Sequence, residues 1–303
     1  MNYQESGIMK HKKELYYHVM MIPGMILLVI FSFIPMIGII MAFQDFSPAR
    51  GLLHSRWVGL KNIRFIFALP DSRQIFTNTI IISLGKIILG ILIPVIFSVL
   101  INAVEGKKFK KMLQTVVYMP HFLSWVVFAS VVQLVFAYDG PINGILGMLG
   151  MDPVMFLGSN QYFRCIMILT DSWKEFGYGS IIYLAALTAI DPGLYEAASI
   201  DGAGRWKQFL HVTIPGIMPI ILIMLTMALP NILNAGFDQI FSLYNPLVYQ
   251  TGDVLDTYVY RVGMVKRQYS LGTAVGLIKS VVGMILILIA NKLVTTFSDR
   301  RMF

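Results

Sequence analysis

Cysteine is almost absent from this chain of 303 residues, which carries only Cys165. A single thiol cannot form an intramolecular disulfide, and its place in an apolar run favours a packing role over a reactive one. Charged residues are also scarce, at 13% of the sequence, whereas hydrophobic residues reach 56% and mean hydropathy is +0.70. A soluble domain carries more charge than this, so the composition predicts an integral membrane protein.

The motifs of nucleotide, metal and hydrolytic chemistry are missing too. No G-x-x-x-x-G-K-[ST] phosphate loop occurs, and no H-E-x-x-H or G-x-S-x-G. The five histidines are scattered rather than grouped with ligand spacing. We therefore expect no enzyme, no metal site and no cofactor in this chain. The net charge of +8 does not indicate nucleic-acid binding, because no soluble domain presents a basic face.

Long apolar runs are what the chain does have, and a membrane span needs about 20 such residues. The predicted spans are 19–43, 76–104, 113–137, 163–189, 215–235 and 274–295. The first run is too long for a signal peptide and no A-x-A site follows it. We predict an all-α polytopic membrane protein with six transmembrane helices. Its parts are an N-terminal segment 1–18, one transmembrane domain 19–298 and a C-terminal tail 299–303.

Basic residues flank alternate ends of these spans, which predicts that both termini are cytoplasmic. The cytoplasmic group is Lys10, Lys12, Lys13, Lys107, Lys108, Lys110, Lys111, Arg205, Lys207, Arg300 and Arg301. The rule is not clean, because a second basic group falls in the first external loop together with Asp45 and Asp71. That group is Arg50, Arg56, Lys61, Arg64 and Arg73.

A loop of small residues lies between the fourth and fifth spans, at 190–214. Asp191-Pro192 is a capping acid followed by proline, so a short helix should begin there, and Gly202 should allow a turn after it. A second short amphipathic helix carrying Arg205, Trp206, Lys207 and Phe209 should follow, before Pro215 opens the next span. The loop should form a rigid knob, or alternatively an ordinary pair of interfacial helices.

The same loop reads Glu196-Ala197-Ala198, three residues, Gly202, nine residues, then Val212-Thr213-Ile214-Pro215. This resembles the EAA loop of ATP-binding-cassette importer permeases, with the pattern E-A-A, x3, G, x9, I-x-L-P. The resemblance implies the type I importer permease fold and an ATPase-coupling role for the loop. The resemblance implies this coupling role for Glu196, Ala197, Ala198, Asp201, Gly202 and Pro215.

The resemblance also implies a set of partners in the cell membrane, among its lipids. They are a second, similar permease subunit, two ATP-binding cassette ATPases that bind ATP and Mg, and an extracellular solute-binding protein. The stretch from Asp171 to Pro192 is similar to carbohydrate-type permeases. Residues 237–249 and 256–261 look closer to the subgroup that serves complex polysaccharides and uronate-containing oligosaccharides. The expected substrate is therefore an oligosaccharide.

The fourth span contains ionisable residues on one helical face, which at membrane depth normally contact protein or water. Asp171, Lys174, Glu175 and Tyr178, together with Trp173, could line a substrate path. The alternative is internal neutralisation, with Asp171 paired to Lys174 and to neighbouring helices. An ion-coupled secondary transporter could use the same cluster as a proton relay. A permease for a non-sugar solute is a further alternative.

Amide and acid side chains end the fifth span, where they could bind sugar hydroxyls. These candidates are Asn231, Asn234, Asp238 and Gln239, and interhelical hydrogen bonding is the alternative. Lys86 and Lys279 lie within predicted spans as either structural or anion-binding lysines.

Overall fold

The computed structural model describes residues 3–297, and the side chains of residues 16–292. The described chain forms two compact units. Unit 1 comprises the residues up to Ile66 together with Val262–Leu277, and unit 2 comprises Phe67–Arg261 and the residues from Ile278 onward. The side chains of Lys10, Lys12 and Lys13 lie outside the described residues, as do Arg300, Arg301 and the predicted tail 299–303.

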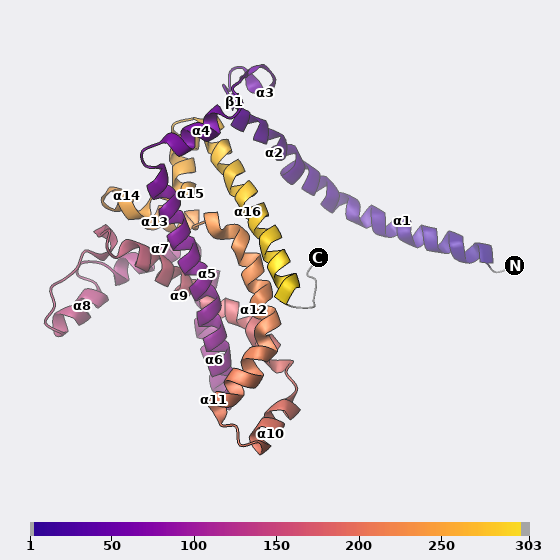
Figure 1. The fold of residues 1–303 in the computed structure, drawn as a ribbon, viewed down its shortest axis with the longest axis vertical. Helices are drawn as coiled ribbons and strands as arrows, with labels where there is room; N and C mark the ends of the chain where they lie inside the picture. Colours follow the sequence, from indigo (N-terminus) through magenta and orange to yellow (C-terminus); the bar gives the residue numbers. More distant parts are fainter. Residues whose placement is uncertain (1–2, 298–303) are drawn as a thin grey trace. The chain divides into compact units, whose positions relative to one another are not determined.

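Helices dominate both units (Figure 1). The α-helices are α1 Tyr3–Leu28, α2 Ile34–Met36, α3 Gly51–His54, α4 Lys61–Ala68, α5 Ser72–Asn102, α6 Lys107–Tyr118, α7 Trp125–Val135, α8 Pro141–Met148, α9 Phe163–Thr188, α10 Pro192–Ile200, α11 Arg205–Gln208, α12 Ile214–Ala228, α13 Phe237–Leu243, α14 Tyr249–Gly252, α15 Leu255–Tyr258 and α16 Tyr269–Phe297. Three π-helical segments are η1 Val29–Phe33, η5 Phe209–Thr213 and η8 Val259–Val265. The 3₁₀ segments are η2 Ile37–Phe43, η3 Met119–Phe122, η4 Phe156–Gly158, η6 Leu229–Leu233 and η7 Pro246–Val248.

Unit 1 begins with a long apolar helix. Elements α1, η1, α2 and η2 follow one another directly, and the apolar part, Tyr16–Phe43, exposes most of its side chains. A helix that is apolar on all sides is not stable in water, so this surface suits lipid or another membrane chain. After it, the two-residue strands β1 (Gln44–Asp45) and β2 (Arg56–Trp57) pair in antiparallel register. This small ladder closes the loop that contains α3.

Unit 2 is held together by α5 and α9, which pack against each other. Glycines permit close approach: a Cβ added at Gly85 would lie 2.4 Å from the Ile168 side chain, and one at Gly177 would lie 2.2 Å from the Val117 carbonyl oxygen. Small residues let membrane helices approach closely and gain packing contacts. One buried apolar cluster is Ile82, Phe128, Ala129, Val132, Phe163, Ile166, Met167, Ala235, Ile240, Leu243, Val248 and Val254. A second is Val95, Tyr183, Leu187 and Ile217.

Four of the described helices are long and apolar enough to cross a membrane, and the number is six if each of two bent helix pairs forms one span. The four are Tyr16–Phe43, Ser72–Asn102, Arg205–Leu233 and Tyr269–Lys292. The prediction of a helical, polytopic membrane protein is therefore confirmed.

The third predicted span, 113–137, is not one continuous helix but part of a bent helix pair. Helices α6 and α7 meet at an angle of 107°. Pro120 lies in the 3₁₀ segment η3, and Ser124 is extended, with φ −62° and ψ 152°. The Ser124 hydroxyl accepts a hydrogen bond from Val127 N at 3.3 Å, which caps the start of α7. The bend thus results from a proline followed by a new helix cap.

Pro215 also does not open the fifth span as predicted. Residues Arg205–Leu233 form one helical run, so the expected second amphipathic helix is the first part of that span. Proline removes a backbone donor within a helix, and such interruptions often coincide with a π-bulge. Here the π-helical segment η5 ends at Thr213, directly before the turn that contains Pro215.

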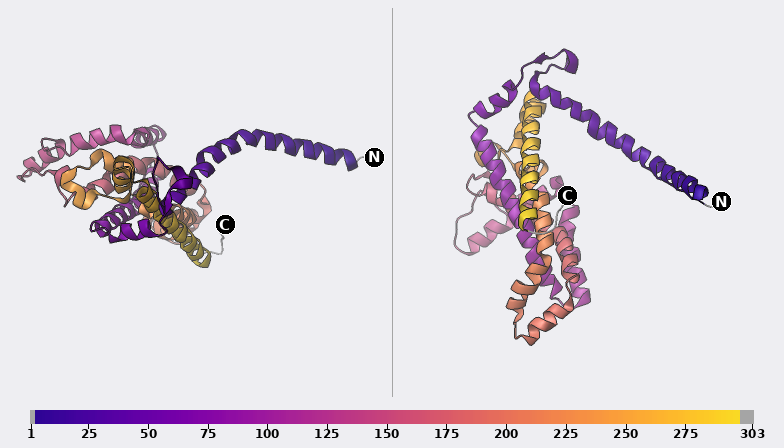
Figure 2. Two further views of the ribbon diagram at one scale, coloured as in Figure 1. Left: turned by 90° about the horizontal axis from the view of Figure 1, so that it is seen from above. Right: turned by 45° about the vertical axis from the view of Figure 1, so that its right-hand side comes forward.

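Within unit 2, α10 and α11 lie at one end, and α14 and α15 lie at the other (Figure 1). Figure 2 shows the same separation from another side, with residues near 200 at the tip of the unit. Helix α5 runs from the α14 and α15 end toward the end that holds α10. The loop that contains α10 and α11 therefore lies at the opposite end of unit 2 from α14 and α15.

Candidate coupling loop and substrate path

Helix α10 begins and ends with defined caps, as its sequence predicts. The Asp191 carboxylate accepts a hydrogen bond from Gly193 N at 2.9 Å, and Pro192 occupies the first helical position. At the other end Gly202 has φ +75°. Its N–H bonds to Ser199 O, and Ala203 N–H bonds to Ala198 O. This is the Schellman arrangement, in which glycine suits the left-handed position.

The loop is also tied to the helix that follows it. The Tyr195 hydroxyl lies 3.0 Å from Thr213 Oγ1, and Gln208 Nε2 donates to Ser199 Oγ at 2.9 Å. Glu196 and Ala197 nevertheless remain exposed, and Ala198 is half-buried. Large apolar side chains beside them are exposed as well, namely Leu194, Ile200 and Trp206. A fixed helix with exposed small and apolar side chains suits docking into another protein.

Two groups of charged side chains lie within unit 2, and Asp171 is not paired with Lys174 as one alternative predicted. Lys86 Nζ on α5 lies 3.0 Å from Asp171 Oδ1 and donates to Ala235 O at 2.7 Å. It also donates to Gln239 Oε1. Lys174 forms an ion pair with the next residue, Glu175, and the distance from Nζ to Oε1 is 2.9 Å. Internal neutralisation does occur, but Lys86, from another helix, supplies the partner of Asp171.

The second charged group includes an aromatic pair that the sequence did not indicate. His121 Nδ1 lies 2.6 Å from Glu175 Oε2, and the imidazole stacks on Tyr178 with ring centroids 3.9 Å apart. Lys174 Nζ also donates to His121 O at 2.9 Å, so these contacts join η3 to α9. Tyr178 and Trp173 still expose 46% and 40% of their surface. Half-exposed aromatic rings beside a carboxylate can contact the faces and hydroxyls of sugars.

Asn231 and Asn234 line a pocket of about 380 Å³ on the surface of unit 2. Lys279, Ser280 and Gly283 on α16 form its other side. Lys279 is paired with Asp256, so it acts here as a structural lysine. Both asparagines are exposed. Amide groups at a pocket wall can donate to and accept from a hydroxylated ligand.

A helix that continued to the end of the fifth predicted span would place Asn231, Asn234 and Asp238 on one face, but the structure does not. The helix stops at Leu233, and Gly236 takes φ +89° before α13 begins, so helical periodicity does not extend to Asp238. Asp238 is exposed on α13. Gln239 is fully buried, where its Nε2 donates to Met167 O and Thr170 Oγ1, both at 2.8 Å. Gln239 is therefore an internal structural contact and not accessible to a substrate.

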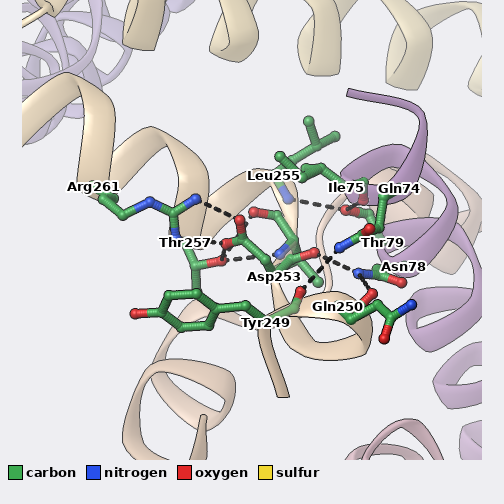
Figure 3. Close-up of polar contacts among 11 residues, drawn as sticks. Gln74, Ile75, Asn78, Thr79, Tyr249, Gln250, Asp253, Leu255, Thr257 and Arg261 are labelled. Carbon is green, nitrogen blue, oxygen red and sulfur yellow. Dashed lines mark hydrogen bonds and ion pairs between the residues drawn. The ribbon is translucent and has the colours of Figure 1, made fainter. Parts of the chain in front are cut away.

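A polar cluster near α14 was missed from the sequence, because its members are far apart along the chain. Asp253 accepts from Arg261 and from Thr257 Oγ1, and Asn78 Nδ2 on α5 donates to Asp253 O at 2.9 Å (Figure 3). Hydrogen bonding to Asp253 raises the pKa of the Arg261 guanidinium. Thr79 Oγ1 accepts from Leu255 N at 2.9 Å. These bonds fasten α14 and α15 to the start of α5.

Comparison with known proteins places this architecture in a family. The sequence profile of the binding-protein-dependent transport system inner membrane component matches residues 94–302. The chain is 38% identical over 297 residues to the polygalacturonan/rhamnogalacturonan transport system permease protein YteP of Bacillus subtilis (strain 168). That match covers 98% of this chain and 92% of the relative. Protein LplB of the same organism is 37% identical, over 96% of this chain and 92% of its own length.

A solved structure is similar over the same extent. It is the crystal structure of a bacterial ABC transporter involved in the import of the acidic polysaccharide alginate. One of its chains matches with a TM-score of 0.87 and 36% identity, over 95% of this chain and 97% of that one. The alginate transporter in complex with an alginate pentasaccharide-bound periplasmic protein matches with a TM-score of 0.86 and 36% identity, over 94% and 96% of the two chains.

Proposed function

This chain belongs to the family of binding-protein-dependent transport system inner membrane components, and on that premise we propose that it is one of two permease subunits of an ATP-driven oligosaccharide importer. The observation that carries the proposal is similarity along nearly the whole chain to YteP and to the alginate transporter. The chain is a transport subunit and not an enzyme. The alternatives of an ion-coupled transporter and of a non-sugar permease have no comparable support.

The partners follow from this role. A second, homologous permease completes the pore, two ATPases bind ATP and Mg, and an extracellular binding protein delivers the oligosaccharide. Helix α10 contacts an ATPase through Glu196, Ala197 and Ala198. The exposed side chains and fixed caps of α10 support this assignment, because a rigid helix transmits a displacement without unfolding. Asp201 and Gly202 end the helix, and Pro215 follows in the next span.

The orientation follows from the coupling role. If α10 contacts a cytoplasmic ATPase, then the end of unit 2 that contains α14 and α15 faces the outside. Lys107, Lys108 and Lys111, which begin α6 and are exposed, then lie on the cytoplasmic side, in accord with the distribution of basic residues. Both termini are cytoplasmic in this arrangement.

Tyr178 and Trp173 supply aromatic surface to the substrate path, and Asn231 and Asn234 supply amides at a pocket wall. Their partial exposure beside ionised groups supports this assignment. The path carries little net charge from Glu175, Lys174 and Asp171, because each of these residues is already paired within unit 2. Substrate hydroxyls then meet neutral pairs rather than isolated charges.

The experiment is ATPase activity of the purified complex in nanodiscs with its binding protein, across neutral and uronate-containing oligosaccharides. We expect stimulation by one class of oligosaccharide. Stimulation by a peptide, phosphate or metal instead would contradict the carbohydrate proposal. A complex that never hydrolyses ATP would contradict the coupling role of α10.

A further inference from the structure

Unit 1 contains a pocket that no role in coupling or in the substrate path explains. It has a volume of about 350 Å³ and is lined by residues 45–46, 61–62, 65 and 267–271. The lining brings together the strand β1, the helix α4 and the start of α16. Ligand pockets typically have volumes of about 300–1,000 Å³, so this one suits a small ligand or the end of a longer one.

The walls of this pocket, which we call the unit 1 pocket, are fixed by hydrogen bonds. Phe46 N donates to Ser270 Oγ at 2.9 Å, and the rings of Phe46 and Tyr269 meet edge to face. Asn62 Nδ2 donates to Ala42 O and Gln44 O, both at 2.9 Å. The pocket therefore keeps its shape without a ligand, which lowers the entropy lost on binding.

Two cations line the unit 1 pocket without a partner acid. Lys61 and Arg267 are exposed, and no carboxylate among the described residues lies within ion-pair distance of either. Arg267 has φ +57°, the only positive φ among the described residues that are not glycine. An unusual backbone conformation that places a charged side chain in a pocket is a feature of functional sites.

The surrounding sequence adds to this positive charge. Residues 44–66 and 262–277 contain six Lys and Arg residues and a single acid, Asp45. Such an excess attracts anions to a concave surface. The pocket also offers groups that suit a sugar, because Phe65 and Tyr269 contribute aromatic rings to its lining and Asp45 and Gln268 can bond to hydroxyls.

We propose that the unit 1 pocket binds a uronic acid residue of an incoming oligosaccharide, with Lys61 and Arg267 holding the carboxylate. Arginine binds a carboxylate through two parallel N–H donors and lysine adds a further charge-assisted bond. The inference rests on the proposed function and orientation, which put the loop after the first span outside the cell. The pocket is then an entry subsite that favours acidic over neutral sugars.

The test uses the complete complex in nanodiscs of zwitterionic lipid, without its binding protein. Binding of tetragalacturonate and of a neutral galactose tetrasaccharide is measured by titration calorimetry. The variant is Lys61→Gln with Arg267→Asn, since asparagine tolerates a positive φ. We expect it to weaken tetragalacturonate binding by at least about tenfold, because the charge-assisted bonds from both cations are lost, and to leave the neutral sugar unchanged.

The matched control is Arg50→Gln with Arg64→Gln. It removes the same charge from exposed positions of unit 1 that do not line the pocket. We expect its affinity for tetragalacturonate to stay within about twofold of the unmodified complex, because exposed charges that do not line the pocket make no direct bond to the carboxylate and are screened by salt. Equal losses in both variants would overturn the proposal and indicate general electrostatic attraction.

A second measurement separates this subsite from the importer function itself. With the binding protein present, ATPase stimulation is measured for both sugars. If the pocket variant lost stimulation by both sugars equally, the pocket would be a docking surface for the binding protein and the proposal would be wrong. If the unmodified complex responded to acidic sugars while the pocket variant bound tetragalacturonate normally, only the subsite would be refuted. Failure of the unmodified complex to respond to any saccharide would refute the proposed function instead.

Discussion

Lys86 and Asp171 place opposite charges inside the helical bundle of unit 2. The Lys86 side chain is 10% exposed and that of Asp171 is 24% exposed. Lys86 directs its ammonium toward three acceptors, which belong to Asp171, Ala235 and Gln239. An ammonium has three donors, so this one is satisfied. The pair joins α5, α9 and the start of α13, and a charge left alone at this depth would be costly.

Removing one partner of this pair should therefore destabilise the protein more than removing both. We expect Lys86→Met and Asp171→Leu each to cost about 3–5 kcal/mol, because each leaves an uncompensated buried charge. The double variant should recover part of that loss, although Gln239 then lacks one of its partners. The measurement is the Tm of the purified chain in detergent. Lys108→Met, at an exposed position, is the control and should leave the Tm almost unchanged.

Additive losses in the double variant would contradict this account. They would mean that the two side chains act independently, so that the 3.0 Å contact contributes little to stability.

At the scale of elements, α10 is short but closed at both ends by its own sequence. Asp191 caps the start, and Gly202 completes the Schellman arrangement at the end. The Tyr195 to Thr213 contact then joins α10 to the helical run that crosses the membrane. This contact would pass a displacement of α10 to that run, as the proposed coupling role requires.

The left-handed turn at Gly202 allows a direct test of the proposed coupling role of α10. Gly202→Thr places a β-branched residue at φ +75° and should cost about 1–2 kcal/mol in strain. We expect loss of uptake and of substrate-stimulated ATPase activity, with the complex still assembled. The control is Gly204→Thr, because Gly204 has φ −67° and ψ 168° and precedes α11 as its N-cap, where threonine is favoured.

Full uptake by the Gly202→Thr complex would show that the turn is not needed for coupling. Equal loss in both variants would point to a general sensitivity of the loop rather than to strain at one residue.

Local signals explain which elements could be predicted from the sequence. The cap of α10, the turn at Gly202 and the helices of the first, second and sixth predicted spans depend on neighbouring residues, and these predictions are confirmed. The bend at Ser124 was missed because the apolar run continues through it. The burial of Gln239 and the pairing of Asp171 with Lys86 depend on contacts between distant segments. Periodicity along one helix cannot supply such contacts.

At the scale of the whole chain, the charged side chains beside the proposed substrate path have ion-pair partners, whereas in the part that the structure describes the cations of the unit 1 pocket do not. Within unit 2, Asp171 is paired with Lys86 and Glu175 with Lys174, and the exposed aromatic rings of Tyr178 and Trp173 lie beside those pairs. Within unit 1, Lys61 and Arg267 line a pocket and have no acid partner among the described residues. Paired charges suit the passage of a hydrophilic solute through a membrane, whereas unpaired cations suit the capture of an anionic one.

Both roles depend on the orientation of the chain, which cysteine labelling can determine. Cys165 is the only cysteine and is exposed, so Cys165→Ser gives the background. Lys108→Cys and Arg50→Cys each add one thiol at an exposed position. With a membrane-impermeant maleimide, we expect Lys108→Cys to react only in inside-out vesicles and Arg50→Cys only in right-side-out vesicles. Labelling of both from the same side would contradict the proposed topology, and it would remove the unit 1 pocket from the path of entering substrate.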